Sequence, residues 1–223
     1  MDEETECMNK HGVWDVVCRP ENKKIIGSKW VYSIKKNPDT KRLRYKARLV
    51  SVGCAQCPSY DHGETFAPVA RIESIRLLLS IAAERHKRVR MYDVKTAFLH
   101  GKLNNEIYMK TLDGYEFGEN TVCRLKKSTY GLKQAGKCWN EYLTEVMLKS
   151  RMCQSMKDPC IFYKSEGQKL LCKIKLYCGI LVDDMVIVSS DDDVEKCYMS
   201  RIRKRIDLKY LGDAKCILGM QVK

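Results

Sequence analysis

Two adjacent aspartates, Asp183 and Asp184, stand between two apolar runs in the stretch Gly179–Ser190, G-I-L-V-D-D-M-V-I-V-S-S. Each run is rich in β-branched residues and has the length of a buried strand, so the pair is expected at a tight hairpin turn. Two carboxylates about 4 Å apart repel by about 4 kcal/mol at an effective dielectric of about 20. Exposure to water would relieve this repulsion, and so would a bound divalent cation. Aspartate is also a common turn residue, so both explanations stay open.

A third carboxylate, Asp93, comes near the end of a strand expected over Val89–Val94. If this strand lies beside the hairpin, three carboxylates converge. Oxygen ligands favour Mg²⁺ or Mn²⁺ over zinc. Two such ions roughly 3.5–4 Å apart would stabilise the attacking and leaving oxygens of a phosphoryl transfer. Because neighbouring strand residues point to opposite faces, one aspartate of the pair should be the main metal ligand, and the other should assist or point away.

Positive charge is concentrated in one segment of a chain whose formal net charge is +13. Lys23–Arg48 holds ten basic residues and one acid, interleaved with apolar and aromatic residues. This pattern predicts a hairpin with one basic face, formed by strands over Ile25–Lys35 and Leu43–Val52 and the turn Asn37-Pro38-Asp39-Thr40. A second basic cluster comprises Arg201, Arg203, Lys204 and Arg205. Such an excess favours nucleic acid, an anionic membrane or an acidic protein as partner.

The remaining segments mix helix and strand patterns. Apolar spacing predicts helices over Ile72–Glu84, Gly136–Ser150 and Asp191–Ile206, the last with aspartates that favour a helix N-terminus. Short apolar runs predict strands over Val122–Leu125, Cys160–Tyr163, Leu170–Val182 and Met185–Ser189, and a final hairpin over Leu211–Val222. Tyr108–Gly118 is expected to be irregular. Without strict βαβ alternation, the prediction is an α+β fold with an antiparallel sheet packed on helices.

No run approaches the roughly 18 apolar residues of a spanning helix, and the N-terminus, MDEETECMNK, is not a signal peptide. A soluble, intracellular protein with no membrane partner is therefore expected. Intracellular thiols are normally reduced, so the twelve cysteines do not indicate disulfides. Cys54, Cys57 and His62 leave a structural zinc site as a poor alternative, because no second cysteine pair has similar spacing.

Seven stretches, taken together and in order, resemble the reverse transcriptase domain of copia-type LTR retrotransposons. They are I-I-G-S-K-W-V-Y, R-Y-K-A-R-L-V, E-T-F-A-P-V-A-R-I-E-S-I-R-L-L-L, Y-D-V-K-T-A-F-L-H-G, C-R-L-K-K-S-T-Y-G-L-K-Q-A-G-K-C-W-N, L-V-D-D-M, and Y-L-G-D followed by I-L-G-M. The resemblance implies an RNA-directed DNA polymerase that uses two Mg²⁺ or Mn²⁺ ions, a template-primer of RNA or DNA, and deoxynucleoside triphosphates. It also implies a cytoplasmic setting, within virus-like particles. Oligomeric state is not indicated.

By this resemblance, Asp93, Asp183 and Asp184 match the catalytic, metal-binding aspartates of the polymerase palm. Phe98 matches the aromatic residue that excludes a ribose 2′-hydroxyl, with core packing as the alternative. Gln134 matches a residue that contacts the incoming nucleotide, with a helix cap as the alternative. Lys46 and Arg48 match residues that contact the triphosphate, with a solvated basic strand as the alternative. Leu218, Gly219 and Met220 match the primer grip, with an ordinary terminal strand as the alternative.

The resemblance further implies a right-hand polymerase architecture over residues 1–223, with 1–88 mainly fingers and 89–223 mainly palm with intervening finger segments. A thumb, a ribonuclease H domain, a protease and an integrase are expected to be absent, which predicts poor processivity. Leu181 stands where the family usually has an aromatic residue that contacts the primer end. An inactive, truncated retrotransposon remnant that binds nucleic acid without catalysis is therefore the alternative function.

Overall fold

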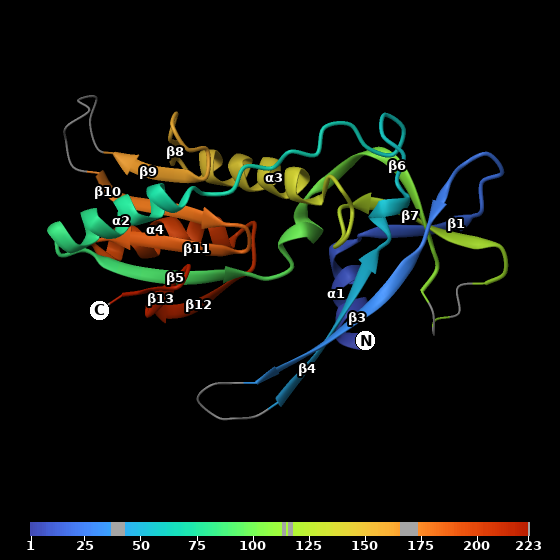
Figure 1. Ribbon diagram of the computed structural model, residues 1–223, viewed down its shortest axis with the longest axis horizontal. Coiled ribbons are helices and arrows are strands. Elements are labelled where there is room, and N and C mark those ends of the chain that lie inside the picture. The colour runs from blue at the N-terminus through green and yellow to red at the C-terminus, as the bar shows by residue number, and fades with distance from the viewer. Residues whose placement is uncertain (37–42, 113–114, 116–117, 166–173, 223) are drawn as a thin grey trace. The chain divides into compact units, whose positions relative to one another are not determined.

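The computed structural model describes residues 1–36, 43–112, 115, 118–165 and 174–222 (Figure 1). The chain divides into two compact units, one of Met1–Phe66 with Phe98–Trp139, the other of Ala67–Ala97 with Asn140–Lys223. The division of the chain falls after Phe66, after Ala97 and within helix α3 (Ala135–Lys149). Helices and largely antiparallel sheets are combined, so the predicted α+β class is confirmed.

The first unit contains a four-stranded sheet and a separate two-stranded ribbon. The sheet has the order β1 (Trp14–Cys18), β7 (Thr121–Lys127), β6 (Lys102–Lys110) and β2 (Ile25–Ile26), in which only β2 pairs in parallel. The ribbon consists of β3 (Ser28–Lys36) and β4 (Leu43–Ser51). This ribbon confirms the predicted basic hairpin from Ser28 onward, whereas Ile25–Ile26, expected in its first strand, forms β2 and pairs with β6. The turn of the hairpin, residues 37–42, lies outside the described residues.

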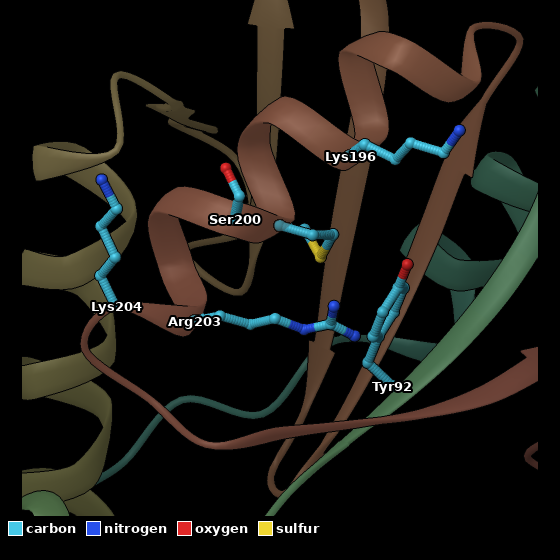
Figure 2. Close-up of a pocket in the computed structure, with 6 residues that line it drawn as sticks. Tyr92, Lys196, Ser200, Arg203 and Lys204 are labelled. Atoms are coloured by element: carbon cyan, nitrogen blue, oxygen red, sulfur yellow. The ribbon is translucent and has the colours of Figure 1, made fainter.

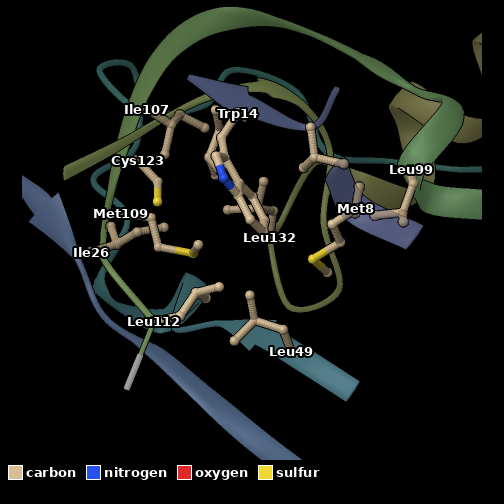
Figure 3. Packing of buried hydrophobic residues seen from close by; sticks show 13 residues of the cluster. Met8, Trp14, Ile26, Leu49, Leu99, Ile107, Met109, Leu112, Cys123 and Leu132 are labelled. Carbon is tan, nitrogen blue, oxygen red and sulfur yellow. The ribbon is translucent and has the colours of Figure 1, made fainter. Parts of the chain in front are cut away.

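Helix α1 (Asp2–His11) packs on this unit through a core that also takes side chains from the sheet and the ribbon (Figure 3). Met8 of α1, Leu49 of β4, and Ile107 and Met109 of β6 are at most 2% exposed. Burying side chains of this size stabilises a fold by about 1.5–3 kcal/mol each. The sequence did not indicate α1, because Thr5 and Met8 are its only buried residues and most of the others are charged or polar.

The second unit is built on a six-stranded antiparallel sheet. Its order is β12 (Leu208–Asp213), β5 (Arg88–Val94), β11 (Asp184–Ser189), β10 (Ile174–Leu181), β9 (Ile161–Ser165) and β8 (Cys153–Gln154). Helices α2 (Ile72–Glu84) and α4 (Asp192–Arg203) pack against the sheet. The predicted capping of α4 is confirmed, since the Asp191 side chain accepts hydrogen bonds from the Asp193 and Val194 amides.

Glycine at position 179 allows α2 to approach β10 closely. A Cβ atom there would lie 2.9 Å from Cδ1 of Ile75 and 3.3 Å from Cδ1 of Leu78. Gly179 is opposite Val186, and strand neighbours alternate between the faces, so α2 covers the same face as Val186. Arg90 of β5 contacts Glu195 of α4. Arg90 and Asp93 are three positions apart in the strand and therefore point to opposite faces, so α4 covers the face opposite Asp93.

Two expectations are corrected by the sheet pairings. Tyr108–Lys110, expected to be irregular, belongs to β6, which is held between β7 and β2. The final hairpin is shorter than expected: β13 (Cys216–Ile217) pairs with β14 (Met220–Gln221), while Leu211–Asp213 belongs to β12 and pairs with β5. In both cases a partner distant in sequence determines the strand, which local composition cannot show. A short 3-10 helix over Ala97–His100 follows β5.

Candidate active site

The Asp183-Asp184 pair lies at the predicted hairpin turn. Leu181 of β10 is opposite Asp184 of β11, so Val182 and Asp183 form a two-residue loop. Val182 has a φ of 57°, a left-handed conformation that costs a β-branched residue roughly 1–2 kcal/mol. The amide of Val94 donates a hydrogen bond of 2.8 Å to the Asp183 carbonyl, which ties this turn to the end of β5.

Asp93 and Asp184 are directly opposite one another on the antiparallel strands β5 and β11. Such partners point to the same face of a sheet with Cβ atoms about 4.5–5.5 Å apart, so the two carboxylates are cross-strand neighbours. Lys209 of β12 is opposite Asp93 on the other side and is exposed. The strand order therefore places one cation and two carboxylates in a row on one face of the sheet.

The expected convergence of three carboxylates is met in part. Across the described ranges, no three His, Cys, Asp or Glu side chains are placed to hold a metal ion. Asp93 and Asp184 are ladder partners, whereas Asp183 belongs to the turn and leaves the alternation that aligns strand residues on one face. The donor set still fits a hard cation, because these three side chains offer only carboxylate oxygens.

The opposite face of β5 carries a buried polar network. Arg90 donates to Glu195 at 2.5 Å and to Asp192 at 2.8 Å, and the Tyr92 hydroxyl donates to Glu195 at 2.7 Å. Burial, together with the hydrogen bond to Glu195, raises the pKa of Tyr92 far above its ordinary value. These contacts fix α4 to the strand that carries Asp93. The sequence offered no signal for them, because the partners lie about a hundred positions apart in the chain.

In the first unit, the strand register gives the ribbon two unlike faces. Lys46 is opposite Ser33 and Arg48 is opposite Val31, so these two cations share one face, as predicted. The other face carries aromatic and aliphatic residues, of which the most exposed are Tyr45 at 75%, Tyr32 at 66% and Ile34 at 63%.

Arg48 is held among aromatic side chains. Its guanidinium carbon lies 5.6 Å from the centroid of the Tyr130 ring, and Phe98 meets Tyr130 edge-on at 5.0 Å. The Nε atom of Arg48 is buried without a hydrogen-bond acceptor among the described residues. Such a donor calls for an explanation, and an anionic ligand would provide an acceptor.

Glu4 of α1 adds a negative charge beside this strand. Burial raises the pKa of the Glu4 carboxyl, while a hydrogen bond from the Leu49 amide and the charges of Lys46 and Arg48 oppose the rise. The charge of Lys46 and Arg48 is thus partly balanced from within the unit.

Gln134 is 5% exposed and lies immediately before α3. Its amide nitrogen donates to the Asp61 carbonyl at 3.0 Å, and its amide oxygen accepts from Gln56 at 3.0 Å. The side chain therefore holds the loop around Gln56 and Asp61, which sequence reasoning did not predict. The predicted contact with an incoming nucleotide stays a prediction.

Leu218 and Gly219 form the two-residue loop between β13 and β14, with φ values of 49° and 80°. Two positive φ angles are typical of a type I′ hairpin turn, which favours Asn-Gly. Leu218 is nonetheless apolar and 53% exposed, whereas Met220 is partly buried. A hairpin at Leu218-Gly219-Met220 is thus confirmed, and its role as a primer grip stays a prediction.

The zinc alternative receives no support from the residues described. Lys24 Nζ lies 3.1 Å from the Cys57 sulfur, and His62 Nδ1 lies 2.9 Å from the Gly63 carbonyl oxygen. Cys54 and Cys57 are both exposed free thiols.

In the described residues no helix has the length and apolar character needed to cross a membrane.

Comparison with known proteins places this chain in a family. The family model described as reverse transcriptase (RNA-dependent DNA polymerase) matches residues 11–223. The chain is 40% identical over 224 aligned positions to the retrovirus-related Pol polyprotein from transposon TNT 1-94 of Nicotiana tabacum, covering 100% of this chain and 17% of that protein. It is 35% and 34% identical to the retrovirus-related Pol polyproteins from transposons RE2 and RE1 of Arabidopsis thaliana, in each case over 94% of this chain and 14% of the relative. The chain belongs to the reverse transcriptase family, as a domain of the copia-type Pol polyproteins.

Proposed function

We propose that this domain catalyses RNA-directed DNA synthesis by transferring a nucleotide from a deoxynucleoside triphosphate to a primer. The observation that carries the proposal is the ladder pairing of Asp93 with Asp184 at the end of the hairpin that bears Asp183. Carboxylates at the ends of neighbouring strands suit Mg²⁺ or Mn²⁺. Such ions, held by these three side chains, would supply charge stabilisation for phosphoryl transfer.

The reaction forms one phosphorus–oxygen bond, breaks another and releases one proton. The oxygen of the primer 3′-hydroxyl attacks the α-phosphorus and loses its proton to solvent, while the bond from that phosphorus to the bridging oxygen breaks and pyrophosphate leaves. Lys209, beside Asp93 in the ladder, contributes positive charge on the same face. That charge would favour the anionic groups of the nucleotide.

The first unit is proposed to bind the nucleotide. Lys46 and Arg48 would contact the triphosphate, which agrees with their shared face and with the buried Nε of Arg48. Phe98 would exclude a ribose 2′-hydroxyl; its contact with Tyr130 gives the ring a fixed support. Gln134 would contact the incoming nucleotide, beside the loop that its amide holds.

We further propose that the second unit corresponds to the palm and that the first unit supplies finger segments. Under this assignment residues 67–88, which include α2, belong with the palm, because they fall in the second unit. Leu218, Gly219 and Met220 would form the hairpin that contacts the primer end. The partners of the domain would be a template-primer of RNA or DNA and deoxynucleoside triphosphates.

Primer extension on an RNA template with Mg²⁺ or Mn²⁺ and deoxynucleotides tests the proposal. Wild type should extend the primer, and Asp183→Asn should reduce extension by at least a hundredfold, which corresponds to about 2.7 kcal/mol. Asp193→Asn is the matched control, because it removes one carboxylate charge from a side chain that is 96% exposed on α4. Equally low incorporation by wild type and Asp183→Asn would refute the enzymatic proposal. Salt-dependent binding without extension would identify an inactive remnant.

A further inference from the structure

A pocket of about 370 Å³ lies between α4 and the six-stranded sheet of the second unit (Figure 2). Tyr92 and Met199, both buried, form its apolar part. The rest of the lining comes from α4 and the residue after it: Lys196, Ser200, Arg203 and Lys204. Because Tyr92 and Asp93 are neighbours in one strand, the pocket lies on the face opposite the proposed catalytic carboxylates.

The lining is basic and holds no carboxylate. Lys196, Ser200 and Arg203 are spaced by four and three positions, so they follow one face of the helix, and Lys204 comes directly after it. Glu195, the nearest buried acid, is bonded to Arg90 and Tyr92. Asp193 lies 3.9 Å from Lys196, but their side chains are 96% and 79% exposed, so this pair contributes little.

Compensation of the helix dipole explains only part of this charge. Cations in the last turn stabilise a helix C-terminus, which accounts for Arg201 and Arg203. It does not account for Lys196, about two turns earlier. It also does not account for the placement of Arg203, whose guanidinium carbon lies 5.8 Å from the centroid of the Tyr92 ring. This cation–π contact holds Arg203 at the pocket.

We propose that this pocket and the basic end of α4 bind the phosphodiester backbone of a nucleic-acid strand. Lys196 and Lys204 leave the helix in different directions, and Arg203 extends towards Tyr92 (Figure 2). A single anion would be bound by donors that converge on one point. Lys196 and Arg203 are instead separated by about 10 Å along the helix, from its rise per residue, and the exposed Arg205 extends the charge further. Cations spaced in this way fit successive phosphates of a polymer.

This site goes beyond the proposed function and is independent of it, because it uses none of the three aspartates. Binding of a fluorescent single-stranded oligonucleotide should be measured by anisotropy in EDTA, at a series of salt concentrations, with the full chain. Each phosphate contact contributes about 0.7 to the slope of log K against log salt for single strands. Arg203→Gln combined with Lys204→Gln should weaken binding and flatten that slope by about 1.4, because two contacts are lost.

Arg151→Gln combined with Lys157→Gln is the matched control, because it removes the same charge from exposed positions of the second unit outside the pocket. The site is supported if the pocket variant loses affinity and slope while the control keeps both. Equal losses in the two variants would assign the effect to net charge and overturn the proposal, as would no loss in either. Pyrophosphate binding without oligonucleotide binding would also overturn it.

The catalytic proposal and this one can fail separately. If extension is absent in every variant but the pocket variant alone loses binding, the site stands and the catalytic proposal falls. Circular dichroism of each variant verifies that the fold is retained.

Discussion

Replacing Arg90 by methionine should destabilise the second unit by about 3 kcal/mol, because the change leaves a carboxylate buried without its cation. Arg90 bonds to Glu195 at 2.5 Å and to Asp192 at 2.8 Å, and its Nε lies 3.5 Å from Asp213. The Arg90 side chain is 13% exposed and that of Glu195 is 3% exposed. Methionine keeps much of the aliphatic volume, so the loss measures mainly the charge.

The magnitude comes mainly from one of the three partners. Asp192 and Asp213 are 45% and 78% exposed, and pairs of this kind contribute about 0–1 kcal/mol. Removing one partner of a buried pair costs about 3–5 kcal/mol. Glu195 would keep the hydrogen bond from the Tyr92 hydroxyl, which places the expected loss near the lower end of that range.

Urea unfolding followed by two probes can assign the loss to a unit. All three tryptophans, Trp14, Trp30 and Trp139, belong to the first unit, whereas circular dichroism reports both units. If the units unfold separately, Arg90→Met should lower the midpoint of a circular dichroism phase and leave the tryptophan phase in place. Arg88→Met is the control on the same strand: Arg88 is 62% exposed and pairs with Asp192, so its loss should stay below about 1 kcal/mol.

A double variant tests the reasoning about charge. Arg90→Met with Glu195→Met removes the stranded carboxylate and should recover part of the stability lost in Arg90→Met. A loss below about 1 kcal/mol in Arg90→Met would refute the estimate. If the double variant loses as much free energy of unfolding as the two single variants together, packing and not charge is responsible.

Two further predictions concern a helix start and a turn. Asp158 accepts hydrogen bonds from the amides of Arg71 and Cys160 and from the Ser74 hydroxyl; burial opposes its ionisation, but these bonds outweigh it and lower the pKa of Asp158. The carboxylate therefore stabilises the fold above its unfolded pKa of about 3.9, and this contribution is lost as pH falls through the lower folded value. Asp158→Asn should cost about 1–2 kcal/mol at pH 7 and flatten the acid limb of stability below about pH 4, measured by urea unfolding across pH; an unchanged acid limb would contradict the assignment. Leu218→Asn should raise the free energy of unfolding by about 1 kcal/mol, because asparagine tolerates the φ of 49°. The same change should reduce primer extension if the exposed leucine contacts the primer. Unchanged extension in a stabilised variant would exclude that contact.

The elements that the sequence predicted best are those whose signal is local. The apolar spacing of Ile72–Glu84 gave the bounds of α2, and the run around Asp183-Asp184 gave the hairpin and its turn. The shared face of Lys46 and Arg48 followed from their spacing of two in a strand. Each of these inferences needs only periodicity and turn chemistry.

Pairings between distant segments could not be obtained in this way. Lys209 comes beside Asp93 only because β12 adds to the free edge of β5. The buried bonds of Gln134 with the loop around Gln56 and Asp61 join segments more than seventy positions apart. Helix α1 has too few buried residues for a clear apolar period, and its packing on β4 is what defines it.

The two faces of β5 explain how its register is specified. A slip of one residue would turn Arg90 and Tyr92 away from α4 and would move Asp93 from its place opposite Asp184. The slipped register would also bury Glu195 without its partners, at a cost of several kcal/mol. The charges on the face that packs against α4 therefore hold the carboxylates of the other face in position. On this reasoning, Arg90 and Glu195 are positioning residues for Asp93, although neither lies on its face of the sheet.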